Sequence, residues 1–346
     1  MPSLITLADI LAARDRIATT AVRTPLVPLS RDRLRAAGFA DLAETAPEIF
    51  LKDESAQPIK SFKLRGAYNK IAQLSPEELK RGVITYSSGN HAQGVAYSAR
   101  ALGAKAVIVM PANSPQIKID ATRALGAEVV FVGPASSERK LKAEELAAAH
   151  GYTIIPPYDD PAIIAGQATC GLEILEQLSD VDLVLSPVSG GGLLSGVATG
   201  IKLGPRPSAL GPLVFGAEPE VAGDSKESFD TKTLVEWPAE KTTRTLCDGL
   251  RTQSLGRLNF EHILQFVDGI VTVSEEEIRT ALRILLAATD IVSEPSGAVT
   301  LAAALFHTRE LPGIGPASKV VAIVSGGNLE PALRTQLESE SSAAPV

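Results

Sequence analysis

The segment Gly82-Val-Ile-Thr-Tyr-Ser-Ser-Gly-Asn-His91 shows the pattern on which the fold of this chain depends. Its apolar first half is typical of a strand, and after the glycine we expect a helix over residues 91–102. The alternation continues, so we predict further strands over residues 106–110, 128–132, 152–155, 181–188, 213–217 and 319–324, and helices over residues 116–125, 138–149, 190–203 and 275–288. Apolar strands that alternate with helices favour parallel sheets buried on both faces. The sequence therefore predicts an α/β protein with two doubly wound parallel-sheet units.

The alternation occurs on both sides of the middle of the chain, which predicts two domains. We expect a small domain over residues 82–159, inserted into a large domain formed by residues 1–81 and 160–337. The first 16 residues alternate charged and apolar types, as in an amphipathic helix rather than a secretion signal. The polar segment 338–346 is predicted to be a disordered tail.

The composition excludes several classes of protein. The 346 residues, 45% of them hydrophobic, suffice for two cores and are unlike a disordered chain. A net charge of −7 without a basic stripe disfavours a nucleic-acid partner. No apolar run reaches about 18 residues, so we expect no membrane span. Cys170 and Cys247 lie far apart without metal spacing, and we interpret them as reduced thiols of a cytoplasmic protein.

Lys63 is the first candidate for chemistry, within Gln57-Pro-Ile-Lys-Ser-Phe-Lys-Leu-Arg-Gly-Ala67. A lysine amine is normally protonated, but beside a carbonyl cofactor its pKa can fall and it can form a Schiff base. Phe62 would supply an apolar plate under a ring, and the neighbouring Lys60 could lower the pKa of Lys63 by repulsion. The ordinary alternative is a solvated surface lysine.

Polar motifs follow three of the predicted strands. Ser87-Ser88-Gly89-Asn90-His91 could hold a carboxylate at a helix N-terminus, and the glycines of Ser189-Gly190-Gly191-Gly192-Leu193 would let the backbone approach a phosphate. Ser325, in Ser325-Gly-Gly-Asn328, is placed to meet a ring nitrogen. Each motif could instead be a capped or bare turn. Together with Lys63, in this order, they predict a pyridoxal phosphate site.

An acidic loop follows the strand predicted over residues 213–217. Glu218, Asp224 and a loop carbonyl could bind Mg²⁺ or Ca²⁺ through oxygen atoms. On sequence alone, a solvated acidic loop is the more frequent arrangement.

These motifs resemble the serine/threonine dehydratase and serine racemase family, from Thr24-Pro25 to Asn328. The resemblance implies a fold-type II pyridoxal phosphate enzyme (tryptophan synthase beta-like), a small amino acid substrate, a homodimer in the cytoplasm and a Mg²⁺ site that could also take Ca²⁺ or Mn²⁺. It assigns catalysis to Lys63 and Ser88. It assigns the cofactor to Phe62, Lys63, Asn90, Ser189, Gly190, Gly191, Gly192, Leu193 and Ser325, the substrate to Ser87, Ser88, His91 and Arg139, and the cation to Glu218, Ala222 and Asp224.

The resemblance also implies the reaction, in which L-threonine or L-serine loses its hydroxyl group and yields a 2-oxo acid and ammonia. A serine at the ring nitrogen, Ser325, is a weaker electron-sink partner than a carboxylate and favours elimination over transamination. Ser88 stands where the threonine dehydratases we compared carry alanine, whereas serine racemases and 3-hydroxyaspartate dehydratases carry serine. Arg139 is similar to a substrate-carboxylate arginine of that subgroup, although a surface arginine is equally compatible with its position.

Several alternatives stay open. Within the family they are serine racemization and 3-hydroxyaspartate dehydration, with Tyr158 and the segment 248–256 closer to the dehydratases. Lys60 replaces a glycine that many members carry. A β-replacement enzyme ranks low. From another class, a non-catalytic α/β protein could bind a nucleotide or phosphate through the same glycine loops.

Overall fold

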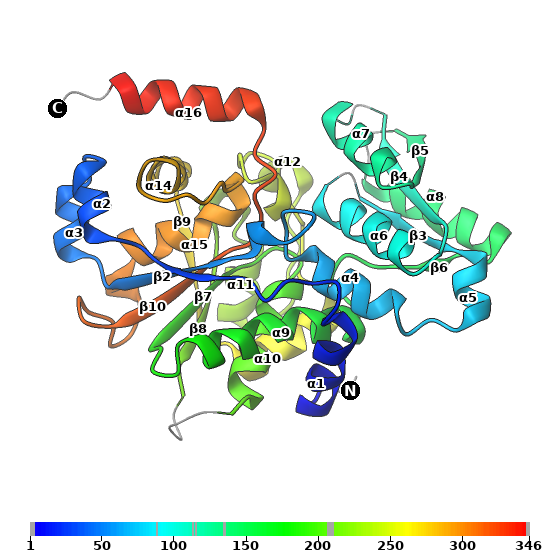
Figure 1. Cartoon of the computed structure of the whole chain (residues 1–346), viewed down its shortest axis with the longest axis horizontal. Helices are drawn as coiled ribbons and strands as arrows, with labels where there is room; N and C mark the ends of the chain where they lie inside the picture. The colour runs from blue at the N-terminus through cyan, green and yellow to red at the C-terminus, as the bar shows by residue number, and fades with distance from the viewer. Residues whose placement is uncertain are drawn as a thin grey trace.

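The computed structural model describes residues 4–87, 89–112, 114, 116–133, 136–205 and 211–343. It contains two β-sheets with helices packed on their faces (Figure 1). This is the α/β architecture with parallel sheets that the sequence predicts. None of the described helices combines the length and the apolar stretch that a membrane crossing needs.

The larger sheet has six strands in the order β1-β2-β10-β7-β8-β9. Only β1 runs antiparallel to its neighbour; the other pairs are parallel. Because β10 lies between β2 and β7, the last strand of the chain is central in this sheet. The bounds are β1 (Leu26–Pro28), β2 (Glu48–Asp53), β7 (Leu183–Pro187), β8 (Leu213–Pro219), β9 (Gly269–Val273) and β10 (Lys319–Val324).

The smaller sheet has four parallel strands in the order β5-β4-β3-β6. Their bounds are β3 (Val83–Tyr86), β4 (Ala106–Pro111), β5 (Glu128–Val132) and β6 (Thr153–Ile154). All four lie within the segment 82–159, and the domain boundaries themselves remain a prediction. β4 is buried along its whole length, as expected for a strand covered on both faces.

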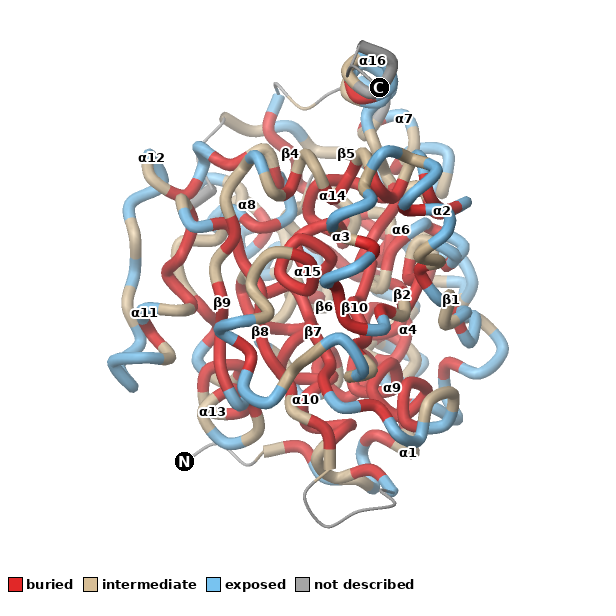
Figure 2. The backbone as a smooth tube through the Cα atoms, turned by 90° about the vertical axis from the view of Figure 1, so that its left-hand side faces the viewer, coloured by how far each residue is buried: buried red, intermediate tan, exposed pale blue. Residues whose placement is uncertain are grey.

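Successive residues of the central strands enter different cores, because side chains alternate across a sheet. Val320 and Ala322 of β10 join the core under α14 (Glu275–Ala288) and α15 (Pro295–Phe306), whereas Val321 and Ile323 join the core under α9 (Pro161–Gln177), α10 (Gly192–Leu203) and α13 (Arg257–Phe266). Figure 2 shows the strands as buried and the outer helices as partly exposed.

The smaller sheet is covered in the same way. Val83 and Ile108 pack against α6 (Asn90–Ala101), while Ile84 and Val107 pack against α8 (Ser136–His150). The other helices are α1 (Leu7–Ile17), α2 (Arg31–Ala36), α3 (Ala40–Thr45), α4 (Lys63–Ile71), α5 (Pro76–Arg81), α7 (Gln116–Ala124), α11 (Asp224–Thr231), α12 (Ala239–Thr242) and α16 (Pro331–Ala343), with short 3₁₀ turns η1 (Glu54–Ala56), η2 (Glu220–Ala222), η3 (Asp248–Leu250) and η4 (Thr308–Glu310).

The C-terminal end departs from the prediction. We expected disorder from residue 338, but α16 continues to Ala343. Leu337 is buried, and Arg279 of α14 pairs with Glu340 at 2.6 Å, so this polar helix is held against the large sheet unit. Residues 344–346 lie outside the described part.

Candidate active site

The polar loops predicted from the sequence follow the carboxyl ends of parallel strands, where ligands bind in open α/β sheets. Residues 87–89 connect β3 to α6, residues 188–191 connect β7 to α10, and residues 325–330 connect β10 to α16. Ser88 lies outside the described residues, so the structure says nothing of its place.

Lys63 and Ser325 are brought together by local pairing of two distant loops. Ser61 forms an isolated antiparallel bridge with Gly326. The backbone N–H of Phe62 donates to the carbonyl of Ser325 at 3.1 Å, and that of Gly327 donates to the carbonyl of Lys60 at 2.9 Å. The loop after β10 is therefore fixed beside the start of α4.

Lys63 is the first residue of α4, and its amine points into a protected space. Nζ donates to the backbone carbonyl of Pro157 at 2.8 Å and lies 5.1 Å from the ring centroid of Phe62. Burial lowers the pKa of Lys63 to about 8, although the charge of Glu294 acts in the opposite direction. More of this amine is neutral at physiological pH than of an ordinary lysine, as a nucleophile or base requires.

Asn90 is held in one orientation. Its Nδ2 donates to Oε1 of Glu294 at 2.6 Å, and its Oδ1 accepts from Nδ2 of Asn328 at 2.7 Å. Burial and the nearby charge of Asp248 raise the pKa of Glu294 to about 7. Sequence reasoning marked Glu294 only as part of a family segment and missed it as a titratable group of this site. The available signal was a carboxylate directly before Pro295, at the start of an apolar helix.

The glycine loop fits a phosphate, because side chains there would close the space. A Cβ on Gly190 would lie 2.4 Å from Cε1 of Tyr158, and one on Gly192 would lie 2.8 Å from Cβ of Tyr158. Gly191 has φ +93°, which favours glycine. No side chain caps the N-terminus of α10, so its first N–H groups can bind an anion.

The other predicted cofactor residues surround this loop. Leu193 is buried in the first turn of α10, and Ser189 Oγ lies 2.8 Å from Oγ1 of Thr252. Ser325 is buried, and its Oγ donates to the carbonyl of Ser296 at 3.5 Å. These contacts fix a loop of small side chains and backbone N–H groups beside Lys63.

His91 is poorly suited to the substrate role predicted for its side chain. Its Nε2 lies 3.0 Å from the carbonyl of Ile155, to which a neutral ring donates. Burial and the charge of Lys63 lower the pKa of His91 to about 3, so the ring stays neutral and Nδ1 can only accept. A carboxylate would have to bind the backbone N–H groups at the start of α6. Ser87 Oγ accepts from the N–H of Gly89 at 3.3 Å in the same turn.

Arg139 lies near the start of α8, at the end of the smaller sheet that carries Ser87 and Asn90. Its Nε is buried without a hydrogen-bond partner among the described residues. Burial lowers the pKa of Arg139, yet arginine remains charged at physiological pH. A half-buried cation with an unused donor is a candidate for binding an anion.

Glu218 and Asp224 form a pair of buried carboxyl groups. Glu218 is on β8, Asp224 begins α11, and Ala222 lies in η2 between them. Oε2 of Glu218 and Oδ2 of Asp224 are buried without partners among the described residues. Burial and the charge of Asp224 raise the pKa of Glu218 well above its usual range, and burial raises that of Asp224 to about 7. A cation would satisfy both oxygens, but no group of three His, Cys, Asp or Glu side chains in the described chain could hold one, so backbone carbonyls and water would have to contribute.

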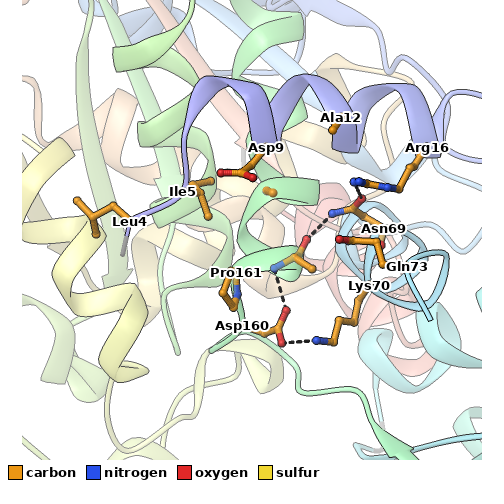
Figure 3. A pocket seen from close by; sticks show the side chains of 12 residues that line it. Leu4, Ile5, Asp9, Ala12, Arg16, Asn69, Lys70, Gln73, Asp160 and Pro161 are labelled. Atoms are coloured by element: carbon orange, nitrogen blue, oxygen red, sulfur yellow. Dashed lines mark hydrogen bonds and ion pairs between the residues drawn. The ribbon is translucent and has the colours of Figure 1, made fainter. Parts of the chain in front are cut away.

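A separate hollow of about 340 Å³ lies between α1, α4 and the start of α9 (Figure 3). Its lining includes Asp9, Arg16, Asn69 and Lys70. None of the predicted site residues lines it, so it is distinct from the space beside Lys63.

Comparisons with known proteins agree with this site. A family model described as pyridoxal-phosphate dependent enzyme matches residues 17–326, which include every predicted site residue. The L-threo-3-hydroxyaspartate ammonia-lyase of Saccharomyces cerevisiae is 38% identical over 327 residues, covering 94% of both chains. The serine racemase of Schizosaccharomyces pombe is 38% identical over 327 residues, 94% of this chain and 95% of the relative. The crystal structure of a threonine deaminase from the organism abbreviated T.th. superposes with a TM-score of 0.84 at 42% identity, covering 94% of this chain and 99% of that one.

Proposed function

This chain belongs to the family of pyridoxal-phosphate dependent enzymes, and from that premise we propose that it is an ammonia-lyase acting on a small L-3-hydroxy amino acid. The observation that carries the proposal is the convergence of Lys63, Asn90, the glycine loop and Ser325, which come from four distant segments. L-threonine and L-serine are the leading substrates.

Each part of the site has a chemical task in this reaction. Bound pyridoxal phosphate supplies an electron sink that acidifies the Cα–H bond of the substrate. Lys63 holds the cofactor and, once its amine is free, accepts the Cα proton, for which a pKa of about 8 is suitable. The glycine loop holds the phosphate, Asn90 orients the ring, and Ser325 meets the ring nitrogen as a neutral partner. Loss of the β-hydroxyl leaves an enamine, which water converts into a 2-oxo acid and ammonia.

Arg139 favours a second candidate, dehydration of 3-hydroxyaspartate. This substrate has a second carboxylate, and the unpaired Nε of Arg139 offers a charge-assisted hydrogen bond to an anion. The yeast relative carries this activity in its name. L-serine and L-threonine lack that second carboxylate.

The test is release of 2-oxo acid from L-serine, L-threonine, both forms of L-3-hydroxyaspartate and D-serine, with pyridoxal phosphate added. Preference for threonine or serine supports the leading proposal, and preference for hydroxyaspartate supports the second. No release from any of them contradicts the ammonia-lyase proposal and directs the search to D-serine formation from L-serine. A colourless protein indifferent to Lys63→Ala would point to the non-catalytic binding class.

Three finer points complete the proposal. Glu218, Ala222 and Asp224 bind Mg²⁺, with Ca²⁺ or Mn²⁺ as substitutes, and the unpartnered carboxylate oxygens support this site. The homodimer and the cytoplasmic location rest on the family resemblance. Gel filtration with light scattering tests the first of these, and fractionation of the source cell tests the second.

A further inference from the structure

Arg65 lies at the centre of a charge cluster that is closed to solvent. Its Nε and Nη2 donate to Glu54 at 2.8 and 2.7 Å, and its Nη1 and Nη2 donate to Glu173 at 2.7 and 2.9 Å. Lys52 adds a second cation, with Nζ 2.6 Å from Oε2 of Glu173. The side chains of Arg65, Lys52 and Glu54 are 0% exposed. Two cations thus balance two carboxylates in the interior.

The cluster joins the elements that hold Lys63. Arg65 belongs to α4, which begins at Lys63, and Glu173 belongs to α9. The residues directly before α9 include Pro157, whose carbonyl accepts from Nζ of Lys63. Both the backbone of Lys63 and the hydrogen-bond partner of its amine are therefore tied to one set of ion pairs.

Helix geometry connects the direction of Arg65 with that of Lys63. Residues two positions apart in an α-helix point about 200° apart around the axis. With Arg65 fixed toward the interior, Lys63 is turned to the opposite side of α4. The backbones of α4 and α9 also touch, since a Cβ on Gly166 would lie 2.6 Å from Cα of Gly66.

A further contact fixes the C-terminal half of α4. Lys70 pairs with Asp160, the cap of α9, at 2.7 Å, and Figure 3 shows this pair beside Asn69, which donates to the carbonyl of Ala162 at 2.7 Å. α4 is thus attached to α9 along its length, and the buried cluster is the attachment nearest to Lys63.

A buried ion cluster adds little stability compared with apolar residues of similar volume, because desolvation of the charges offsets their attraction. What a guanidinium fork on two carboxylates does provide is a defined orientation. We propose that Arg65 is a positioning residue for Lys63: the buried cluster with Glu54 and Glu173 fixes the rotation of α4 and so directs the Lys63 amine at the cofactor. The inference rests on the proposed function, in which Lys63 holds that cofactor.

The test compares Arg65→Lys, which keeps the charge but loses the fork, with the parent protein. In the cofactor-free protein, the rate of Lys63 modification by trinitrobenzenesulfonate is followed against pH and assigned by peptide mass spectrometry. Capture of pyridoxal phosphate is followed by absorbance. We expect capture to slow by about tenfold or more, and the pH midpoint of Lys63 modification to rise toward that of an ordinary lysine. Ile71→Val, which removes a buried methyl group from the same helix, controls for lost stability and should change neither readout.

A folded Arg65→Lys protein with unchanged Lys63 modification and cofactor capture would overturn the proposal. If that variant does not fold, Glu173→Gln keeps the volume and one acceptor oxygen, and the same two readouts decide. Failure of the parent protein to capture pyridoxal phosphate at Lys63 would instead contradict the proposed function. The modification rate would still test whether Arg65 positions the amine.

Discussion

Asn90 donates its side-chain amide to Glu294 across 2.6 Å, and this bond joins the first residue of α6 to the residue that precedes α15. The bond therefore links a helix of the smaller sheet to a helix of the larger one. Because Asn328 donates to Oδ1 of Asn90, the amide cannot rotate, and its remaining N–H has a fixed direction. Glu294 thus orients the residue proposed to bind the cofactor ring.

Glu294→Gln should remove part of the pH dependence of stability. The folded-state pKa of Glu294 is raised from 4.5 to about 7 by burial, so folding favours the protonated form. Its stabilising contribution is present below pH 4.5 and is lost as the pH rises to 7, by about 3 kcal/mol. Urea unfolding of the cofactor-free protein at pH 5 and pH 7.5 measures this loss. Glutamine keeps an acceptor for Asn90, so the variant should lose less stability over this interval; parallel profiles would contradict the prediction.

Mg²⁺ should stabilise the protein, and more so at higher pH. Asp224 has a pKa raised to about 7 and Glu218 one raised well above its usual range, so at pH 5 protons compete with the ion. We expect the Mg²⁺-induced rise in melting temperature to grow between pH 6 and pH 8. Glu218→Gln should abolish it, whereas Asp230→Asn on the same helix α11 should not.

The fluorescence of Trp237 offers an independent readout of the same site. Its Cη2 lies 3.4 Å from the Cβ position of Gly223, between Ala222 and Asp224, and the chain has no other tryptophan. A saturable Mg²⁺-dependent change in emission that Glu218→Gln removes is expected. An emission that ignores Mg²⁺, together with an unchanged melting temperature, would leave a solvated acidic loop as the better description.

The local elements of this fold follow from the sequence because each is a short-range pattern. The helix predicted over residues 275–288 coincides with α14, which Ser274 starts through a capping box. β2 was not predicted, because Lys52 and Asp53 make its end read as polar. Their burial becomes understandable only when Glu173, 121 residues away, pairs with Lys52.

The candidate site divides in the same way. Lys63, the glycine loop and Ser325 are recognisable because each occupies a compact motif after a helix start or strand end. The pairing of Ser61 with Gly326, the contact of Tyr158 with the glycine loop and the buried Glu294 depend on distant segments. No local periodicity encodes such contacts, and single-sequence reasoning could not find them.

Arg139→Ala should separate the two candidate substrates. If Arg139 binds a second carboxylate, kcat/KM for L-3-hydroxyaspartate should fall by about 10- to 100-fold, the worth of a hydrogen bond to a charged group. The value for L-serine should change little. Arg123→Ala, in the neighbouring helix α7, is the control. Equal losses for both substrates would mean that Arg139 holds the α-carboxylate, and no loss for either would leave it a surface residue.

Lys60→Gly should stabilise the protein without changing its chemistry. Lys60 stands where many members of the resembling family carry glycine, and its φ of 57° lies in the left-handed region. A side chain there costs about 1 kcal/mol relative to glycine. The backbone bonds of Lys60 to Gln57 and Gly327 need no side chain, so the loop that positions Lys63 should keep its shape. Lys232, with φ 55° at the end of α11, is the matched control, and Lys232→Gly should give a similar gain. Urea unfolding measures both gains, and kcat should stay at the parent value in each variant. A loss of activity in Lys60→Gly alone would show that the Lys60 side chain serves the site.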